Sequence, residues 1–340
     1  MQITTVGLDL AKRIFQVHAV DASGGVVVRK ALRQSQVLPF FTKLPPCLIG
    51  IEACGTSHHW ARELTKLGHE VRIMPPAYMK PYVKLSKNDA VDAEAICEAV
   101  TRPTMRFVAM KSTEQQAALS VHRVRDLLVK QRTQLLNMIR GILAEFGIDI
   151  PEGVERALGL ARQIAAKEAE PDVPPIALLC GQGLDTHVRL QVIDRAIIAL
   201  QRTDDVARRL ATIPGIGPVG ATALAASVAD PGQFRSGREF AAWLGLTPSQ
   251  NSSGGKDRLG RITKMGDRYL RKLLVIGATS LVRRAKYKPE AADPYLLALL
   301  ARKPARVASV AMANKMARVV WAVMARGEVY QARHAPSLAA

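Results

Sequence analysis

A change in the spacing of apolar residues near residue 110 constrains the fold of this 340-residue chain more than any other feature. Before it, short apolar runs are separated by glycine and proline turns, which is typical of β-strands. After it, between residues 114 and 146, apolar side chains recur every seven residues, at Val121, Leu128, Leu135 and Ile142, and Val124 and Met138 fill two of the intervening positions. That period predicts one long helix, in a coiled coil or a helical bundle.

The first part of the chain alternates predicted strands and helices. Strands are expected at 2–10, 13–20, 25–31, 47–53 and 70–74, and helices at 57–67 and 89–100. The glycine turn at 21–25 makes the first three strands antiparallel. We therefore expect a mixed α/β domain, and the order of its elements suits an RNase H-like fold.

The rest of the chain is predicted to be mainly helical. Prolines and acidic residues in 147–175 indicate a linker or boundary, and a second long helical stretch is expected over 176–211. After it the chain is helical with one long interruption, 247–266. We therefore divide the chain into an α/β domain (1–110), a helical coiled-coil connector (111–205) and a mainly α C-terminal domain (206–330).

Positive charge is concentrated in the second half. The chain has 48 Lys and Arg against 29 Asp and Glu, a net charge of +19, and residues 202–340 carry +14 of it (23 basic, 9 acidic). Such a surface is typical of a protein that binds a polyanion, above all nucleic-acid phosphates. Aromatic residues make up only 5% of the chain, so binding mainly by stacking bases on rings is not expected.

Other classes of protein find little support. The four cysteines have no paired CxxC spacing, which argues against a zinc site or a disulfide framework. The N-terminus lacks the apolar segment of a signal peptide, and the longest apolar run, near 273–282, is too short to cross a bilayer. We expect a cytoplasmic protein without a membrane partner.

Four carboxylates in the first domain stand in unusual places. Asp9 and Glu52 lie at the ends of apolar strands, and Asp89 and Asp92 lie on one face at the start of a helix. Each alone is explained by a local role, such as helix capping by Ser86 to Asp89. Together, four such oxygen ligands can hold a pair of hard cations, for which Mg²⁺ is the expected ion, as used in phosphoryl transfer.

Two segments of the C-terminal domain match phosphate chemistry. The run IPGIGPVG at 213–220 places Gly215 and Gly217 between two helices, as in a helix-hairpin-helix that binds the DNA backbone, although an ordinary αα-turn has the same residues. The loop 246–266 contains Ser252 and Ser253, followed by the basic residues Lys256, Arg258, Arg261, Lys264, Arg268 and Arg271. One serine could attack a DNA phosphate, or the loop could only bind it.

These motifs together resemble the DEDD transposases of insertion sequences, a group that includes Piv-type DNA invertases. The resemblance rests on GLDLAK, GIEACGT and KNDAVDAEAI in the first domain and on IPGIGPVGA, FAAWLGLTPSQNSSGGKDRLGRITKMGD and YLRKLL in the last, and it covers residues 3 to 330. It implies a RuvC-like catalytic domain, with Asp9, Glu52, Asp89 and Asp92 as Mg²⁺ ligands.

The resemblance also implies a serine in the QNSSGG loop that forms a phosphoserine link to DNA, at Ser253 or Ser252, with Ser253 preferred. It implies donor and target DNA as partners, an element-encoded guide (bridge) RNA, and a homo-oligomer, a dimer or tetramer with shared active sites. The expected activity is excision and insertion of a mobile element. The alternatives are a metal-dependent nuclease of the Holliday-junction resolvase type and a non-catalytic nucleic-acid organiser.

Overall fold

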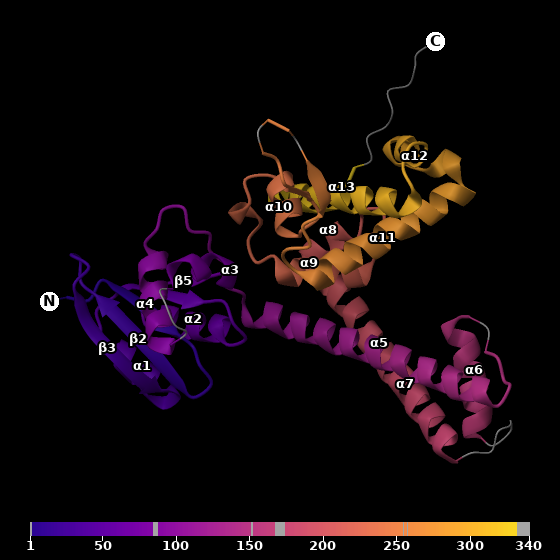
Figure 1. Cartoon of the computed structure of the whole chain (residues 1–340), viewed down its shortest axis with the longest axis horizontal. Helices are drawn as coiled ribbons and strands as arrows, with labels where there is room; N and C mark the ends of the chain where they lie inside the picture. Colours follow the sequence, from indigo (N-terminus) through magenta and orange to yellow (C-terminus); the bar gives the residue numbers. More distant parts are fainter. Residues whose placement is uncertain are drawn as a thin grey trace, which may run out of the picture. The chain divides into compact units, whose positions relative to one another are not determined.

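The computed structural model describes residues 2–83, 88–150, 152–166, 174–253, 255–256 and 258–331. The chain divides into two compact units, residues 1–112 and residues 113–340 (Figure 1). The predicted connector and C-terminal domain both lie in the second unit. Each unit is described by itself below.

The first unit is built on a five-stranded mixed sheet with the order β3-β2-β1-β4-β5. The strands are β1 (Thr5–Asp9), β2 (Ile14–Val20), β3 (Val26–Arg33), β4 (Leu48–Glu52) and β5 (Glu70–Met74). The first three are antiparallel neighbours, and β4 runs parallel to β1 and β5. The predicted strands are confirmed, and the sheet is compatible with an RNase H-like domain.

Helices and short helical turns complete this unit. They are α1 (Val37–Thr42), α2 (Ser57–Lys66), α3 (Pro76–Met79) and α4 (Asp89–Val100), with 3₁₀ turns at Gln34–Gln36 and Lys80–Tyr82. The helices predicted at 57–67 and 89–100 are confirmed, whereas the short helix α1 was not expected. Ser86, the residue proposed to cap α4, lies outside the described residues.

Two glycines let α4 lie directly on the sheet. Gly7 of β1 pairs with Gly50 of β4, so both face the same side. A Cβ on Gly7 would stand 2.1 Å from the Ala93 carbonyl oxygen, and a Cβ on Gly50 would stand 2.8 Å from the Cβ of Val100. Only residues without a side chain permit this approach. The opposite face is covered in part by α2, where Trp60 packs edge-on against Phe15 at 5.1 Å.

Gly7→Ala should therefore destabilise the first unit. The added methyl group meets helix backbone, which cannot rotate away, so we expect a loss of at least about 1–3 kcal/mol, the usual cost of overpacking. Urea unfolding followed by circular dichroism measures it. Gly55→Ala is the control, because a Cβ there has nothing within 4 Å. Equal midpoints for the two variants would contradict the close approach.

The second unit begins with three helices around a small core. They are α5 (Thr113–Glu145), α6 (Val154–Ala165) and α7 (Pro174–Thr203). Leu136, Ile139 and Leu143 of α5 pack with α6 and with the start of α7. The long helix predicted at 114–146 is confirmed. The prediction of a linker over 147–175 is wrong for 154–165, because α6 is amphipathic and buries its apolar side in this core.

The seven-residue seam of α5 lies one residue away from its predicted position. Within the unit, the fully buried α5 residues are His122, Leu136, Ile139 and Leu143, whereas Val124 and Met138 are exposed. Ion pairing explains the shift, since Arg125 of the buried side bonds to Asp194 of α7 through Nε at 2.6 Å. Because Arg125 and Asp194 are polar, a count of apolar residues along the sequence does not identify this side of α5 as the buried one. The coiled coil is not confirmed.

The remaining helices form the largest core. They are α8 (Asp205–Leu210), α9 (Pro218–Ser227), α10 (Gly237–Trp243), α11 (Arg268–Tyr287), α12 (Pro294–Leu300) and α13 (Ala305–Arg326), with 3₁₀ turns at Pro231–Gln233 and Pro289–Ala291. The helical stretch predicted over 176–211 is confirmed and consists of two helices, because Asp204 follows α7 and caps α8 through the Ala207 amide at 2.9 Å. The segment 247–266 contains a hairpin of β6 (Pro248–Gln250) and β7 (Leu259–Ile262).

Among the described residues, α13 is the one helix long and apolar enough to cross a membrane. Its buried residues, from Ala308 to Val323, belong to the core of the second unit. Core helices of water-soluble proteins pass the same test. We therefore assign α13 to the core.

Candidate functional site

Asp9 and Glu52 stand at the same edge of the sheet. They are the last residues of β1 and β4, two adjacent parallel strands whose last paired residues are Leu8 and Ile51. Because side chains alternate along a strand, Asp9 shares the face of Gly7, and Glu52 shares the face of Gly50. Both carboxylates are half-buried and lie on the side of the sheet that carries α4.

The direction of α4 brings the other two acids to that edge. Ala93 lies over Gly7, and one turn later the Cys97 Sγ lies 3.8 Å from the Thr5 carbonyl oxygen. The helix thus runs antiparallel to β1, and the residues that precede Ala93 lie toward Asp9. Asp89 and Asp92 occupy this first turn.

Capping of α4 falls to another residue. The Asn88 side chain accepts a hydrogen bond from the Ala90 amide at 3.0 Å, so Asn88 is the N-cap. Capping thus does not require the Asp89 carboxylate. A role limited to helix capping therefore explains Asp89 less well.

The charges of the other three carboxylates act on Asp9. Burial, followed by the charges of Asp89, Asp92 and Glu52 in that order, raises the pKa of Asp9 to about 6. A carboxylate whose pKa is raised by burial and by neighbouring like charges is a recurrent property of functional sites. We call these four residues the acid cluster.

The acid cluster has the chemistry of a hard-cation site. All its donors are carboxylate oxygens, which Mg²⁺ and similar ions prefer, and a bound cation would relieve the repulsion that raises the pKa of Asp9. In the described part of the chain, however, no three such side chains converge closely enough to form a ready ligand set. The donors therefore fit a divalent ion by type and place, and binding requires the side chains to close on it.

Asp9→Asn should stabilise the metal-free protein at neutral pH. The folded state holds the Asp9 proton up to about pH 6 and the unfolded state only up to about 3.8, so native Asp9 costs stability once the pH rises through that window. Because Asp9 is partly solvent-screened, we expect a gain on the order of 1 kcal/mol at pH 7.5 that vanishes near pH 4.

Thermal melting in a chelator across this pH range measures the effect. Addition of Mg²⁺ should reverse the order, raising the melting temperature of the unaltered protein more than that of the variant. A difference between the two proteins that does not change with pH or metal would contradict the cluster.

The glycine turn of the second unit lies between α8 and α9. Gly215 has φ +85°, and Gly217 is the N-cap residue of α9, with Pro218 in the first helical turn. Gly215 is pressed against α11, where a Cβ on Gly277 would stand 2.0 Å from its carbonyl oxygen. Gly217 is exposed. Close packing against α11 therefore explains why residue 215 is a glycine. Gly217, in contrast, faces solvent.

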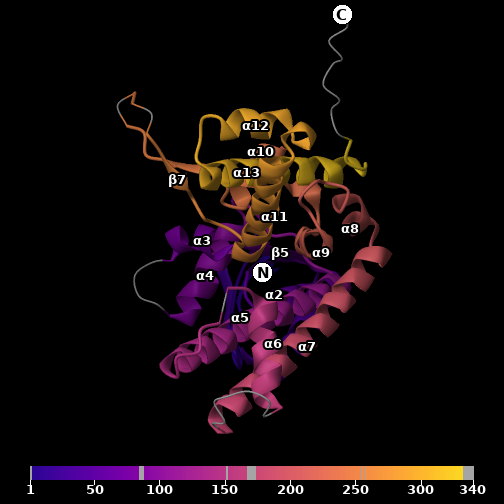
Figure 2. The same ribbon diagram turned by 90° about the vertical axis from the view of Figure 1, so that its right-hand side faces the viewer.

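The base of the serine hairpin, residues 245–266, is clamped on both sides. Gly245 and Gly266 both have positive φ, and a Cβ on either would strike the opposite strand, at 2.2 Å from the Met265 oxygen and 1.8 Å from the Trp243 oxygen. Arg271 Nη1 donates to the carbonyls of Leu244 and Met265 at 2.9 and 2.8 Å. Figure 2 shows the hairpin projecting from the helices of its unit.

The two candidate serines differ in their surroundings. The Ser252 Oγ accepts hydrogen bonds from the Arg258 amide at 3.2 Å and the Gln250 side chain at 3.1 Å. Ser253 is tied into the hairpin through its backbone, since its carbonyl accepts from the Lys256 amide at 3.2 Å, and its side chain is exposed. Gly254 lies outside the described residues. Both serines are exposed, and the Ser252 hydroxyl is held by hydrogen bonds inside the hairpin.

The predicted phosphate-contacting residues fall into two groups. Five are exposed along the hairpin and at the start of α11: Lys256, Arg258, Arg261, Lys264 and Arg268. Arg271 is half-buried and braces the hairpin base through the two carbonyls described above. Its guanidinium thus has a structural task that the sequence did not reveal.

A buried polar relay joins α5 to α9 and α11, and sequence reasoning missed it. Thr222 Oγ1 donates to the Pro218 carbonyl at 2.7 Å and therefore accepts from His122 Nε2 at 3.0 Å. His122 Nδ1 then accepts from the Tyr269 hydroxyl at 3.2 Å. Burial lowers the pKa of His122 to about 4, which keeps it neutral. The relay connects α9, which follows the glycine turn, to α11, which follows the serine hairpin. In the sequence, the one sign of it is a histidine within the heptad pattern of residues 114–146.

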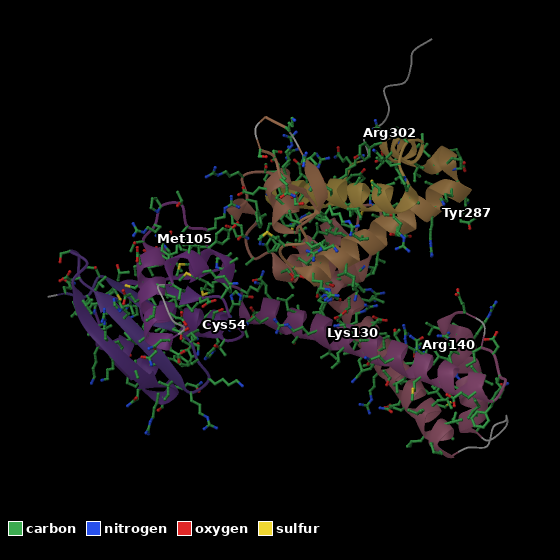
Figure 3. The ribbon with its side chains drawn as sticks, in the orientation of Figure 1. Cys54, Met105, Lys130, Arg140, Tyr287 and Arg302 are labelled. Atoms are coloured by element: carbon green, nitrogen blue, oxygen red, sulfur yellow. The ribbon has the colours of Figure 1, made fainter. Side chains whose placement is uncertain are left out.

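Further ion pairs strengthen this junction. Lys272 of α11 bonds to Asp126 of α5 at 2.6 Å, and Lys130, labelled in Figure 3, bonds to the same carboxylate at 2.7 Å. The Lys272 pair holds α11 against α5 at the end nearest the hairpin, and the Lys130 pair lies within α5.

The fold and the two candidate centres define a class of protein: an α/β domain with a carboxylate cluster, followed by a basic helical part, as in enzymes that cut polynucleotides. Family models place the chain more closely. A model described as Transposase, of the DEDD type of IS110, matches residues 6–148, and the Transposase IS116/IS110/IS902 family model matches residues 207–295.

Similar proteins agree with this assignment over almost the whole chain. A "Probable family 20 transposase" of Pseudomonas aeruginosa is 49% identical over 97% of this chain and 99% of its own length. The transposase for insertion sequence element IS1328 of Yersinia enterocolitica is 37% identical over 96% and 98%, and that for IS1111A of Coxiella burnetii is 36% identical over 97% and 92%. The chain belongs to the IS110 family of transposases.

Proposed function

We propose that this transposase excises and inserts its element by Mg²⁺-dependent strand cleavage, through a phosphoserine intermediate on Ser253. The observation that carries the proposal is the acid cluster at the carboxyl ends of β1 and β4, whose members together raise the pKa of Asp9. Transposase family membership supports cleavage and rejoining of DNA.

The acid cluster would hold the metal. Bound there, Mg²⁺ supplies charge neutralisation to the attacked phosphate and its leaving oxygen. Asp9 and Glu52 are fixed by the sheet, and Asp89 and Asp92 by the N-terminal turn of α4, so the four ligands come from three rigid elements. Residues on strands and helices hold the geometry of a site more precisely than residues on loops.

Ser253 would supply the nucleophile. Its Oγ forms a bond to phosphorus, one backbone P–O bond breaks, and the departing sugar oxygen takes up the proton that the serine loses. The phosphoester bond is thereby conserved on the protein, so the strand can be rejoined without ATP. The clamped hairpin base and the relay through His122 support a fixed presentation of this hydroxyl.

The exposed basic residues of the hairpin would bind donor and target DNA phosphates near Ser253. Lys256, Arg258 and Arg261 neutralise the charge that develops during attack. Gly217 would offer backbone amides at the start of α9 to the same backbone, as in a helix-hairpin-helix. An element-encoded guide RNA and a dimer or tetramer with shared active sites belong to the proposal through the family resemblance. The cytoplasmic location expected from the sequence belongs to it as well.

Incubation of the purified protein with DNA that carries its element end, followed by a denaturing gel, tests the proposal. A Mg²⁺-dependent protein–DNA adduct that survives denaturation is expected. Free 5′-phosphate ends without an adduct would favour the alternative, a resolvase-type nuclease, which the structure allows because the acid cluster is complete within the first unit. Intact DNA under all conditions would refute both.

A further inference from the structure

A second basic site lies in the first unit, at the same sheet edge as the acid cluster. A hollow in the surface is lined there by Arg13, Ile14, Arg33, Gln34 and Ser35. These residues come from the turn between β1 and β2 and from the end of β3. We call them the edge hollow.

The strand register places Ile14 and Arg33 of the edge hollow on the face of the acid cluster. Asp9 pairs with Gln16, and Gln16 pairs with Ala31, so these three share one face. Ile14 and Arg33, which pair with each other, lie two residues further along the same face. An ion pair at 3.4 Å between Arg29 of that face and Glu94 of α4 confirms that this is the α4 side.

The distance between the edge hollow and the acid cluster fits a single nucleic-acid strand that contacts both. Arg33 lies two strands and two residues from Asp9, which corresponds to about 12 Å between Cα atoms at normal sheet spacings. A B-form strand advances about 3.4 Å per nucleotide along the helix axis and more along its own path, so the two sites are at most three to four nucleotides apart. The line between them follows the open edge of the sheet.

The two arginines of the edge hollow are not neutralised by ion pairs with other described residues. In the described parts of the chain neither Arg13 nor Arg33 forms an ion pair, whereas Arg29, Arg72 and Arg102 of the same unit each do. Between the two arginines, Ile14 is 50% exposed, unusual for isoleucine in a strand. Two free cations around an exposed apolar side chain match a phosphate backbone with its sugars.

Resting on the proposed function, we propose that the edge hollow binds the DNA strand that enters the acid cluster, with Arg13 and Arg33 on its phosphates and Ile14 against a sugar. It would hold that strand at most three to four nucleotides from the phosphate under attack. The first unit would thus have its own DNA-binding site, separate from the basic hairpin of the second unit.

The salt dependence of binding by the full chain tests this site. A labelled duplex of random sequence serves as the probe, and the slope of log K against log salt is measured by fluorescence anisotropy. Arg13→Ala/Arg33→Ala should lower the slope by about 1.8, since each lost phosphate contact removes about 0.9.

The charge-matched control is Lys30→Ala/Lys43→Ala. Lys30 lies on the other face of β3, and Lys43 precedes β4 at the opposite end of the sheet, so the slope should stay unchanged. Equal slopes for the unaltered protein and the arginine variant, or equal losses in both double variants, would overturn the proposal.

Photocrosslinking supplies a direct contact. With Ile14 replaced by p-benzoylphenylalanine, irradiation should attach the same duplex, whereas the replacement at Val26, exposed at the other end of the sheet, should not. Crosslinking to single-stranded RNA but not to DNA would overturn the DNA assignment. Neither measurement needs cleavage: failure of the adduct assay alone removes the proposed chemistry, and an unchanged slope alone removes the edge hollow.

Discussion

Ser253→Ala should form no covalent protein–DNA adduct while it binds DNA and Mg²⁺ as the unaltered protein does. Only a hydroxyl at this position can become the phosphoserine, so the expected loss is to background, at least about 10³-fold, as for removal of other catalytic nucleophiles. A denaturing gel with end-labelled DNA measures the adduct, and anisotropy measures binding.

Ser252→Ala is the matched control. The Ser252 hydroxyl oxygen accepts bonds from Arg258 and Gln250 within the hairpin, so its loss should loosen the tip and lower the rate by roughly tenfold, the effect of about 1.4 kcal/mol. If Ser253→Ala still forms the adduct and Ser252→Ala does not, the two roles are exchanged. If both variants form it, the serine mechanism is refuted.

Mixing Ser253→Ala with Asp9→Ala protein extends this test. The acid cluster and the serine lie in different compact units, and a shared active site would let one chain supply the acids and another the serine. Partial recovery of adduct formation is expected. No recovery in mixtures proven to form hetero-oligomers would argue against a shared site.

Asp9→Ala should abolish strand cleavage, with a loss of about 10³-fold or more, and leave DNA affinity within about twofold. The Asp9 carboxylate is the member of the acid cluster on which the other three charges act, so its removal opens the ligand set at its centre. Glu52→Ala, Asp89→Ala and Asp92→Ala should show the same pattern. Cleavage rates over a range of Mg²⁺ concentrations measure it.

Glu98→Ala on the same helix is the control. Glu98 pairs with Arg102 at the far end of α4, at 2.6 Å, so its loss should leave cleavage unchanged. Normal cleavage by Asp89→Ala would show that this residue serves the helix start and not the metal. Normal cleavage by all four variants would refute the acid cluster as the cleavage centre.

Local patterns predicted most of the first unit correctly. The strands around Gly7 and Gly50 and the helix from Asp89 to Val100 follow from alternation, turns and capping, which act between near neighbours. For the same reason, the positions of Asp9 and Glu52 at strand ends were visible in the sequence. The family resemblance named the same four acids, and the comparisons established the family.

Other features depend on contacts between distant residues. The seam of α5 shifted by one residue because Arg125 and His122 are paired by Asp194, Thr222 and Tyr269, which a heptad count cannot know. Likewise α6 forms because its apolar side has a core to enter, although prolines flank it. The bracing role of Arg271 also depends on where the hairpin strands meet.

The sequence by itself determined the kinds of elements, the acids, the serine loop and the excess of positive charge, since these reside in residue type and near-neighbour spacing. Only the tertiary structure decided that α4 runs antiparallel to β1, which brings Asp89 and Asp92 to the edge that holds Asp9. It also decided which arginines are paired and which, in the edge hollow, are not. The physical reason is that burial and charge pairing are sums over neighbours in space, and the chain acquires those neighbours only when it folds.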